Sequence, residues 1–64
     1  MKTGLAKLLI GVRVKLLKTI QWHELTIPRG TRGYIVSVIK NAVAVDFGSR
    51  YGRFEVFARE ITRD

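Results

Sequence analysis

The amino-acid sequence predicts an all-β fold, a small barrel of five strands with a long loop between strands 1 and 2 and a short 3₁₀ turn before the last strand. Apolar residues alternate with polar ones over residues 10–16 and 53–57, which is the period of a half-buried strand. Residues 33–47 are rich in β-branched and aromatic side chains, which favour strands. A chain of 64 residues without cysteine holds one domain that depends on its apolar core.

The first strand is predicted over residues 10–16. Its alternating apolar residues are Ile10, Val12, Val14 and Leu16. A helical alternative competes with this strand, because apolar residues between positions 3 and 17 also recur at three- and four-residue spacing. Gly11 and the β-branched valines disfavour a helix, so we expect a strand.

Residues 1–9 are expected to form a basic lead-in with a short helical turn over Leu5 to Leu9, so that the barrel spans residues 10–64. Lys7 interrupts the apolar stretch of this lead-in, and we therefore expect no secretion signal. No apolar run approaches the roughly 20 residues of a membrane-spanning helix. Together with the lack of cysteine, these features predict a cytoplasmic protein.

A long loop is predicted over residues 19–30, because no hydrophobic period is sustained there. It ends in Pro28-Arg29-Gly30, where proline presets φ and glycine admits the conformations that a turn needs. Trp22, the only tryptophan, lies in this loop, where its ring can cap the barrel or contact a partner.

A hairpin follows the loop. Residues 33–39 give the strongest strand pattern, and residues 42–47 form the partner strand across the two-residue turn Lys40-Asn41. We expect a type I′ turn, because Asn41 tolerates the left-handed conformation. In this register Tyr34, Val36 and Val38 share one face of the first strand. Val43, Val45 and Phe47 share one face of the partner strand.

The glycine-bounded turn from Gly48 to Gly52 predicts a second hairpin, whose second strand covers residues 53–57. Residues 58–60 are short enough for one 3₁₀ turn. Ile61-Thr62 is then expected to pair with the first strand and close the sheet. The aromatic residues expected in the core are Tyr34, Phe47, Phe54 and Phe57.

Four segments resemble the sequence pattern of SH3-like barrels, and the resemblance extends over most of the chain. Residues 11–16 (GVRVKL) look like the G-x-x-V-x-V/L first strand, and residues 28–38 (PRGTRGYIVSV) look like the G-x-x-G-x-V-x-x-V second element. Residues 43–47 (VAVDF) and 57–61 (FAREI) are similar to the third strand and to the closing F…E-L/I. The chain resembles KOW-type modules of transcription factors and ribosomal proteins, and also the small SH3-like accessory subunits of photosystem I and of ferredoxin-thioredoxin reductase.

Either resemblance implies a binding module. KOW-type modules often contact nucleic acid or RNA polymerase, whereas the accessory subunits belong to electron-transfer assemblies. The glycines of the pattern, Gly30 and Gly33, are explained by a sharp bend and by close packing of neighbouring backbone. They therefore indicate the fold and not a ligand.

The charge of the chain points to the partner class. Twelve Lys and Arg residues against five Asp and Glu give a formal net charge of +7, so nucleic acid and acidic proteins are the expected partners. We predict a nucleic-acid-binding or nucleic-acid-associated module. The residues predicted to contact phosphates are Arg13, Lys15, Arg29, Arg32, Arg50 and Arg53, and those predicted to stack on bases are Trp22 and Tyr51.

Two other functions stay open at this point. The same cations can recognise an acidic protein, with Trp22 as a buried anchor. If residues 3–17 are helical, they can instead lie in a membrane interface. The pattern is compatible with a monomer and with a dimer formed through an edge strand.

Catalysis is not expected. The chain has one histidine, His23, and its carboxylates are spread over different elements without the spacing of metal ligands. No glycine-rich loop joins a strand to a helix, so the sequence offers no nucleotide site. We therefore predict no catalytic residue, no metal and no cofactor.

Overall fold

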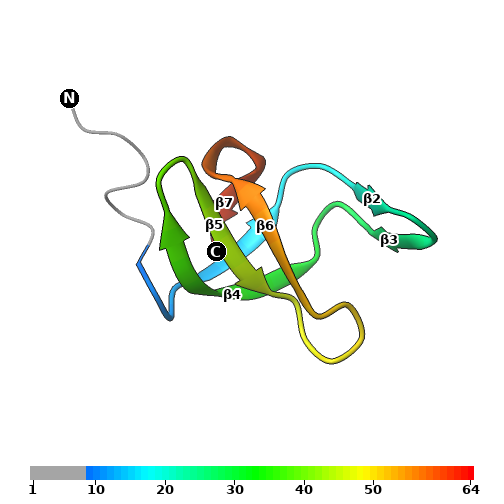
Figure 1. The fold of residues 1–64 in the computed structure, drawn as a ribbon, viewed down its shortest axis with the longest axis horizontal. Helices are drawn as coiled ribbons and strands as arrows, with labels where there is room; N and C mark the ends of the chain where they lie inside the picture. Colours follow the sequence, from blue (N-terminus) through cyan, green and yellow to red (C-terminus); the bar gives the residue numbers. More distant parts are fainter. Residues whose placement is uncertain (1–8) are drawn as a thin grey trace.

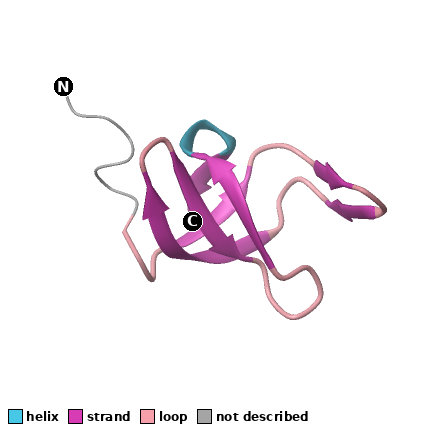
Figure 2. Cartoon of the chain, viewed as in Figure 1, coloured by secondary structure: helices cyan, strands magenta, loops and turns pink. Residues whose placement is uncertain are grey.

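The structure is a computed structural model that describes residues 9–64, and these residues form seven short strands and one 3₁₀ turn (Figures 1 and 2). The elements are β1 (Arg13–Leu16), β2 (Ile20–Trp22), β3 (Leu25–Ile27), β4 (Arg32–Ile39), β5 (Ala42–Asp46), β6 (Arg53–Phe57), the 3₁₀ turn η2 (Ala58–Glu60) and β7 (Ile61–Arg63). The predicted all-β class is confirmed, as is the 3₁₀ turn before the last strand.

Five strands form one antiparallel sheet in the order β6-β5-β4-β1-β7, and β2 and β3 form a separate two-stranded hairpin. The pairing of β7 with β1 is the one that the sequence predicts. The sheet is not the closed barrel expected, because β6 and β7 stay at its two edges. At the β6 edge, the backbone N–H of Phe57 donates to Oε1 of Glu60 at 2.9 Å, so this side chain of η2 satisfies the last backbone donor of β6.

β1 begins at Arg13 and not at Ile10. Residues 10 and 11 form a turn in which Gly11 has a φ of 91°. The helical alternative is therefore wrong for residues 9–17, and so is the part of the membrane-interface hypothesis that needs a helix there. The predicted lead-in and its helical turn lie outside the described residues, apart from Leu9.

The predicted long loop contains the β2–β3 hairpin, which extends away from the five-stranded sheet in Figure 1. Its strands pair Ile20 with Ile27 across the two-residue turn His23-Glu24. His23 has a φ of 55°, a conformation that residues with side chains adopt infrequently. The sequence does not reveal this hairpin, because three-residue strands are too short to establish a period and the turn lacks glycine and asparagine.

A β-bulge in β4 changes which residues face the core. The pairing of β4 with β5 shifts between Ile35 and Ser37, so that Val36 is an extra residue. Tyr34 and Val38 consequently lie on opposite faces, and the shared face predicted for them is wrong. Ile35 is buried in the core, whereas Tyr34 is exposed.

The turns agree with the sequence in position but not always in conformation. The two-residue turn Lys40-Asn41 joins β4 and β5 as predicted. It is not of type I′, because His23 is the only non-glycine with positive φ among the described residues. Gly30 has a φ of 92°, as the turn predicted at the end of the long loop requires.

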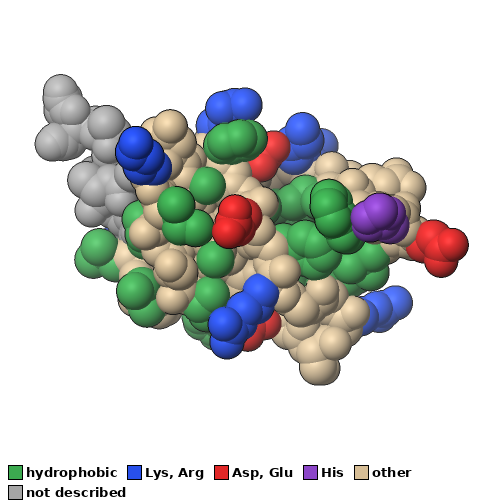
Figure 3. Space-filling model, viewed as in Figure 1, with side chains coloured by type: hydrophobic (Ala, Val, Ile, Leu, Met, Phe, Trp, Pro, Cys, Tyr) green, Lys and Arg blue, Asp and Glu red, His purple; other side chains and the backbone are tan. Residues whose placement is uncertain are grey.

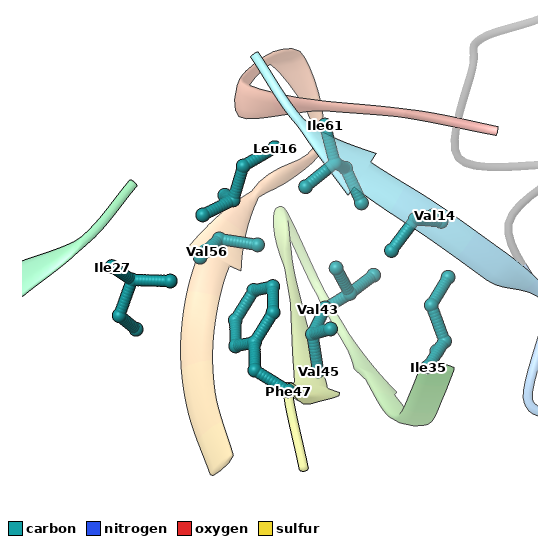
Figure 4. Close-up of a cluster of buried hydrophobic side chains, with 9 residues drawn as sticks. All are labelled: Val14, Leu16, Ile27, Ile35, Val43, Val45, Phe47, Val56 and Ile61. Carbon is teal, nitrogen blue, oxygen red and sulfur yellow. The ribbon is translucent and has the colours of Figure 1, made fainter. Parts of the chain in front are cut away.

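Side chains from the sheet and the hairpin meet in one core (Figure 4). The buried residues are Val14, Leu16, Ile27, Ile35, Val43, Val45, Phe47, Val56 and Ile61. The shared face predicted for Val43, Val45 and Phe47 is therefore confirmed, and it is buried. Phe54 is only partly buried, and Tyr34 and Phe57 are exposed, which corrects the expectation that they lie in the core. Ile27 enters the core from the hairpin and anchors it (Figure 4).

Candidate nucleic-acid interface

β1 and β4 bring three cations together on the outer side of the sheet. Arg13 and Lys15 alternate along β1 with Val14 and Leu16, which point into the core. Lys15 lies directly opposite Arg32 of β4. We call Arg13, Lys15 and Arg32 the cationic face.

Asp64 joins the two arginines of the cationic face. Its Oδ2 accepts one hydrogen bond from Nε of Arg13 at 3.0 Å and one from Nε of Arg32 at 2.6 Å. The backbone N–H of Asp64 donates to the carbonyl of Arg13 at 2.9 Å, which holds the carboxylate beside β1. Because both bonds use Nε, the terminal N–H groups of each guanidinium are not needed for them.

The surroundings of Asp64 favour its charged form. The side chain is only 15% exposed, and this loss of water opposes ionisation. The hydrogen bond from Arg32 and the positive charges of Arg32, Arg13 and Lys15 together outweigh that effect and hold the pKa of Asp64 below its usual value. Asp64 therefore contributes stability that is present above its unfolded-state pKa and is lost as the pH falls through the lower folded-state pKa.

An Asp64→Asn substitution is expected to reduce the acid sensitivity of folding. The difference in unfolding free energy between wild type and variant should be constant at neutral pH and should shrink as the pH falls below about 4. In an Arg13→Gln, Arg32→Gln background the same substitution should change the pH profile much less, because the carboxylate has lost its hydrogen-bond donors. Thermal unfolding across a pH series measures both effects, and superimposable profiles of wild type and Asp64→Asn would contradict the arrangement.

A row of outer-face residues continues from the cationic face across the sheet. Arg13 lies opposite Tyr34, Tyr34 opposite Asp46, and Asp46 opposite Arg53. Arg53, one of the predicted phosphate contacts, is thus on β6, three strands from β1 in the sheet. The row has an arginine on each side of an aromatic ring and a carboxylate.

Arg29 lies at the border of the cationic face. It is exposed in the turn that leads into β4, and its backbone N–H donates to Oγ1 of Thr19 at 3.1 Å. The N–H of the next residue, Gly30, donates to the carbonyl of Leu16 at 2.9 Å. This bond ties the turn to the end of β1.

Trp22 lies on another part of the surface. Its side chain is 59% exposed, and its ring meets that of His23 edge to face at 4.6 Å. With Ile20, Phe54 and Arg53 it lines a groove of about 460 Å³ between the hairpin and β6. Figure 3 shows hydrophobic side chains exposed where the hairpin meets the sheet.

Arg50 and Tyr51 form a contact of their own in the turn between β5 and β6. The guanidinium carbon of Arg50 lies 5.6 Å from the centre of the Tyr51 ring, within the range of a cation–π interaction. Tyr51 also packs against the core and is partly buried.

The structure therefore groups some predicted site residues and separates others. Arg13, Lys15 and Arg32 lie together with Arg29 at their border, whereas Trp22, Arg50 and Tyr51 lie apart from them.

No protein family, curated protein or solved structure matches the chain. Within residues 9–64, no three His, Asp or Glu side chains are grouped closely enough to hold a metal ion. In the same residues, no helix has the length and apolar character needed to cross a membrane.

The sequence prediction misses three residues of this surface, Tyr34, Asp46 and Asp64. Asp64 follows the predicted pairing of residues 61–62 with the first strand, and extending that pairing by two residues brings it beside Arg13. The exposure of Tyr34 depends on the bulge at Val36, and the alternation of the surrounding residues gives no sign of it.

Proposed function

We propose that this chain is a non-catalytic binding module that contacts nucleic acid through the cationic face. The observation that carries the proposal is the shared carboxylate of Asp64, which holds Arg13 and Arg32 side by side while their side chains stay 52% and 56% exposed. Guanidinium groups bind phosphate oxygens through paired N–H donors, and an arginine that is already oriented loses less entropy on binding. Lys15, next to both, adds a third positive charge.

We further propose that the module is SH3-like, with an open sheet. Along the chain, a strand is followed by a long connection, two hairpins, a 3₁₀ turn and a final strand, which is the layout that the resemblance implies. The final strand returns to pair with the first. The β2–β3 hairpin lies within the long connection and leaves this order unchanged.

An acidic protein is the competing partner. That hypothesis uses the same cations but requires Trp22 as a buried anchor beside them. Trp22 lines the groove at β6 together with Arg53 and lies apart from the Asp64-linked arginines. Nucleic acid is therefore favoured, because phosphate recognition needs the cations alone.

Neutralising two of the three residues of the cationic face is expected to reduce the salt dependence of binding to DNA. For Arg13→Gln, Lys15→Gln, the slope of log affinity against log salt should fall by about 1.8 with duplex and about 1.4 with single strands, since each lost phosphate contact removes about 0.9 or 0.7. The measurement is a fluorescence titration of labelled DNA at several salt concentrations.

The matched control is Lys40→Gln, Arg59→Gln, which removes the same net charge from two exposed residues that lie outside the cationic face and are not predicted phosphate contacts. Its slope should stay close to that of wild type. Equal slopes for the two variants would place binding elsewhere. No DNA or RNA binding at low salt, together with tight binding of a poly-glutamate peptide, would replace nucleic acid by an acidic protein.

A further inference from the structure

A shallow pocket lies directly beside the cationic face. It has a volume of about 280 Å³ and lies between the start of β4 and the end of β5, where Arg32, Tyr34, Asp46 and Gly48 contribute to its wall. Ligand pockets for drug-sized molecules start at about 300 Å³, so this one suits a single flat ring system. Arg32 belongs to both the pocket and the cationic face, and a ligand with a phosphate next to a ring can reach both.

Tyr34 supplies an exposed aromatic surface at this pocket. Its side chain is 52% exposed, although it comes from a strand whose next residue, Ile35, is fully in the core. Arg13 lies opposite Tyr34 on β1, and Arg32, two residues earlier on the same face of β4, lines the pocket with it, whereas Asp46 lies opposite the ring on β5. An exposed ring flanked by phosphate-binding groups is the arrangement on which unpaired bases stack.

Asp46 makes the pocket selective. Its Oδ1 accepts a hydrogen bond from the backbone N–H of Gly48 at 2.9 Å, which orients the carboxylate. Within the described residues, Asp46 forms no ion pair, although Arg53 is its neighbour on β6. A carboxylate at this position repels phosphate and accepts N–H groups, so it favours the edge of a base that carries several donors.

We infer that the pocket binds an unpaired base of single-stranded nucleic acid, stacked on Tyr34 with its N–H edge on Asp46, while the cationic face holds the adjoining phosphates. Guanine fits best, because its Watson–Crick edge presents two neighbouring N–H donors to a carboxylate that has two oxygens. This inference rests on the proposed function. It adds a preference for single strands over duplex and for guanine over other bases. In a duplex the same edge is paired and both faces are stacked, so a duplex can use the cationic face only.

The test uses a short single-stranded thymidine oligonucleotide with one central guanine, the same strand with thymine or an abasic site at the centre, and the duplex, each as DNA and as RNA. Wild type should bind the guanine strand about 5- to 150-fold more tightly than the abasic strand, the range expected for one stacked base. Tyr34→Ala should remove most of this difference. Trp22→Ala, which truncates an aromatic residue of similar exposure that does not line this pocket, should leave it unchanged.

Asp46→Asn separates base recognition from charge. The asparagine oxygen still accepts the N–H of Gly48, but its amide group presents donors to the donors of guanine. Removing a negative charge should raise affinity for every strand, whereas loss of the guanine contact should abolish the preference for guanine over thymine. A variant that binds all strands more tightly and keeps the preference would overturn the role of Asp46.

The outcomes distinguish this inference from the proposed function. In one outcome, binding depends on salt and responds to Arg13→Gln, Lys15→Gln, and yet is equally tight for guanine, thymine and abasic strands. That result would reject the pocket and retain the cationic face. Duplex binding as tight as single-strand binding would also reject the pocket. Absence of binding to every strand would reject both. A difference between the DNA and RNA arms would identify which nucleic acid the pocket accepts.

Discussion

An alanine at position 33 is expected to destabilise the protein by about 3 kcal/mol, the upper part of the range for overpacked cores. A Cβ atom on Gly33 would lie 2.6 Å from the carbonyl oxygen of Asp46, 2.8 Å from Cγ1 of Val45 and 3.0 Å from Cδ1 of Phe47. A backbone carbonyl in a sheet cannot swing away as the end of a flexible side chain can. β4 and β5 would therefore have to separate, and denaturant unfolding should report this as a lower midpoint.

Gly30 provides a control in which a different cause operates. A Cβ atom on Gly30 would meet no atom within 4 Å, but its φ of +92° is one that residues with side chains rarely adopt. Gly30→Ala should therefore cost only backbone strain, about 1 to 2 kcal/mol. If Gly30→Ala lowers the midpoint more than Gly33→Ala does, the close approach of β4 to β5 is contradicted.

The same close approach positions the proposed binding surface. Gly33 lies between Arg32 and Tyr34 in β4, and because it has no side chain, β4 can approach the Asp46 carbonyl closely. A separation of the strands would displace Tyr34 from Asp46. At temperatures where Gly33→Ala is still folded, we therefore expect it to weaken the guanine preference more than the binding of duplex DNA.

The sequence predicts best those elements that depend on local signals. β6 covers residues 53–57 as expected, because alternation there is uninterrupted and a glycine-bounded turn precedes it. The turn containing Gly30 and the 3₁₀ turn before β7 are likewise set by a few adjacent residues. Pairing of β7 with β1 follows from the requirement that Ile61 be buried, and it lies beside Leu16 in the sheet.

The features that the sequence does not predict arise from contacts between distant residues. The bulge at Val36 is a difference in length between two paired strands, which neither strand reveals alone. The sequence also does not reveal that Asp64 joins two arginines, because one of them comes from β1 and the other from β4. The sequence therefore predicts which cations belong to the candidate site but not how they are grouped. Tyr34 and Asp46 are recognised as part of the site only from the folded structure.

Truncating Ile27 is expected to have the largest effect among the hairpin residues. Its side chain is 0% exposed and comes from β3 into the core, so Ile27→Ala should cost about 2 to 5 kcal/mol. A domain of this size has a total stability of roughly 3 to 10 kcal/mol, so the variant is expected to be marginal at room temperature. The loss should appear as a lower denaturation midpoint with an unchanged slope.

Ile39→Ala is the matched control, because the same side chain is truncated at a residue that is 41% exposed beside the turn between β4 and β5. Its cost should be below about 1 kcal/mol, since most of the removed surface is already in water. Ile27 also ties the hairpin to the sheet, so amide exchange in Ile27→Ala should speed up in β2 and β3 before it does in β1 and β4. Equal costs for the two variants, or loss of protection first in β1, would mean that the hairpin is not held by this residue. The order in which these strands open matters for function. If the hairpin opens while β1 and β4 stay paired, the Trp22 groove is lost and the cationic face stays intact.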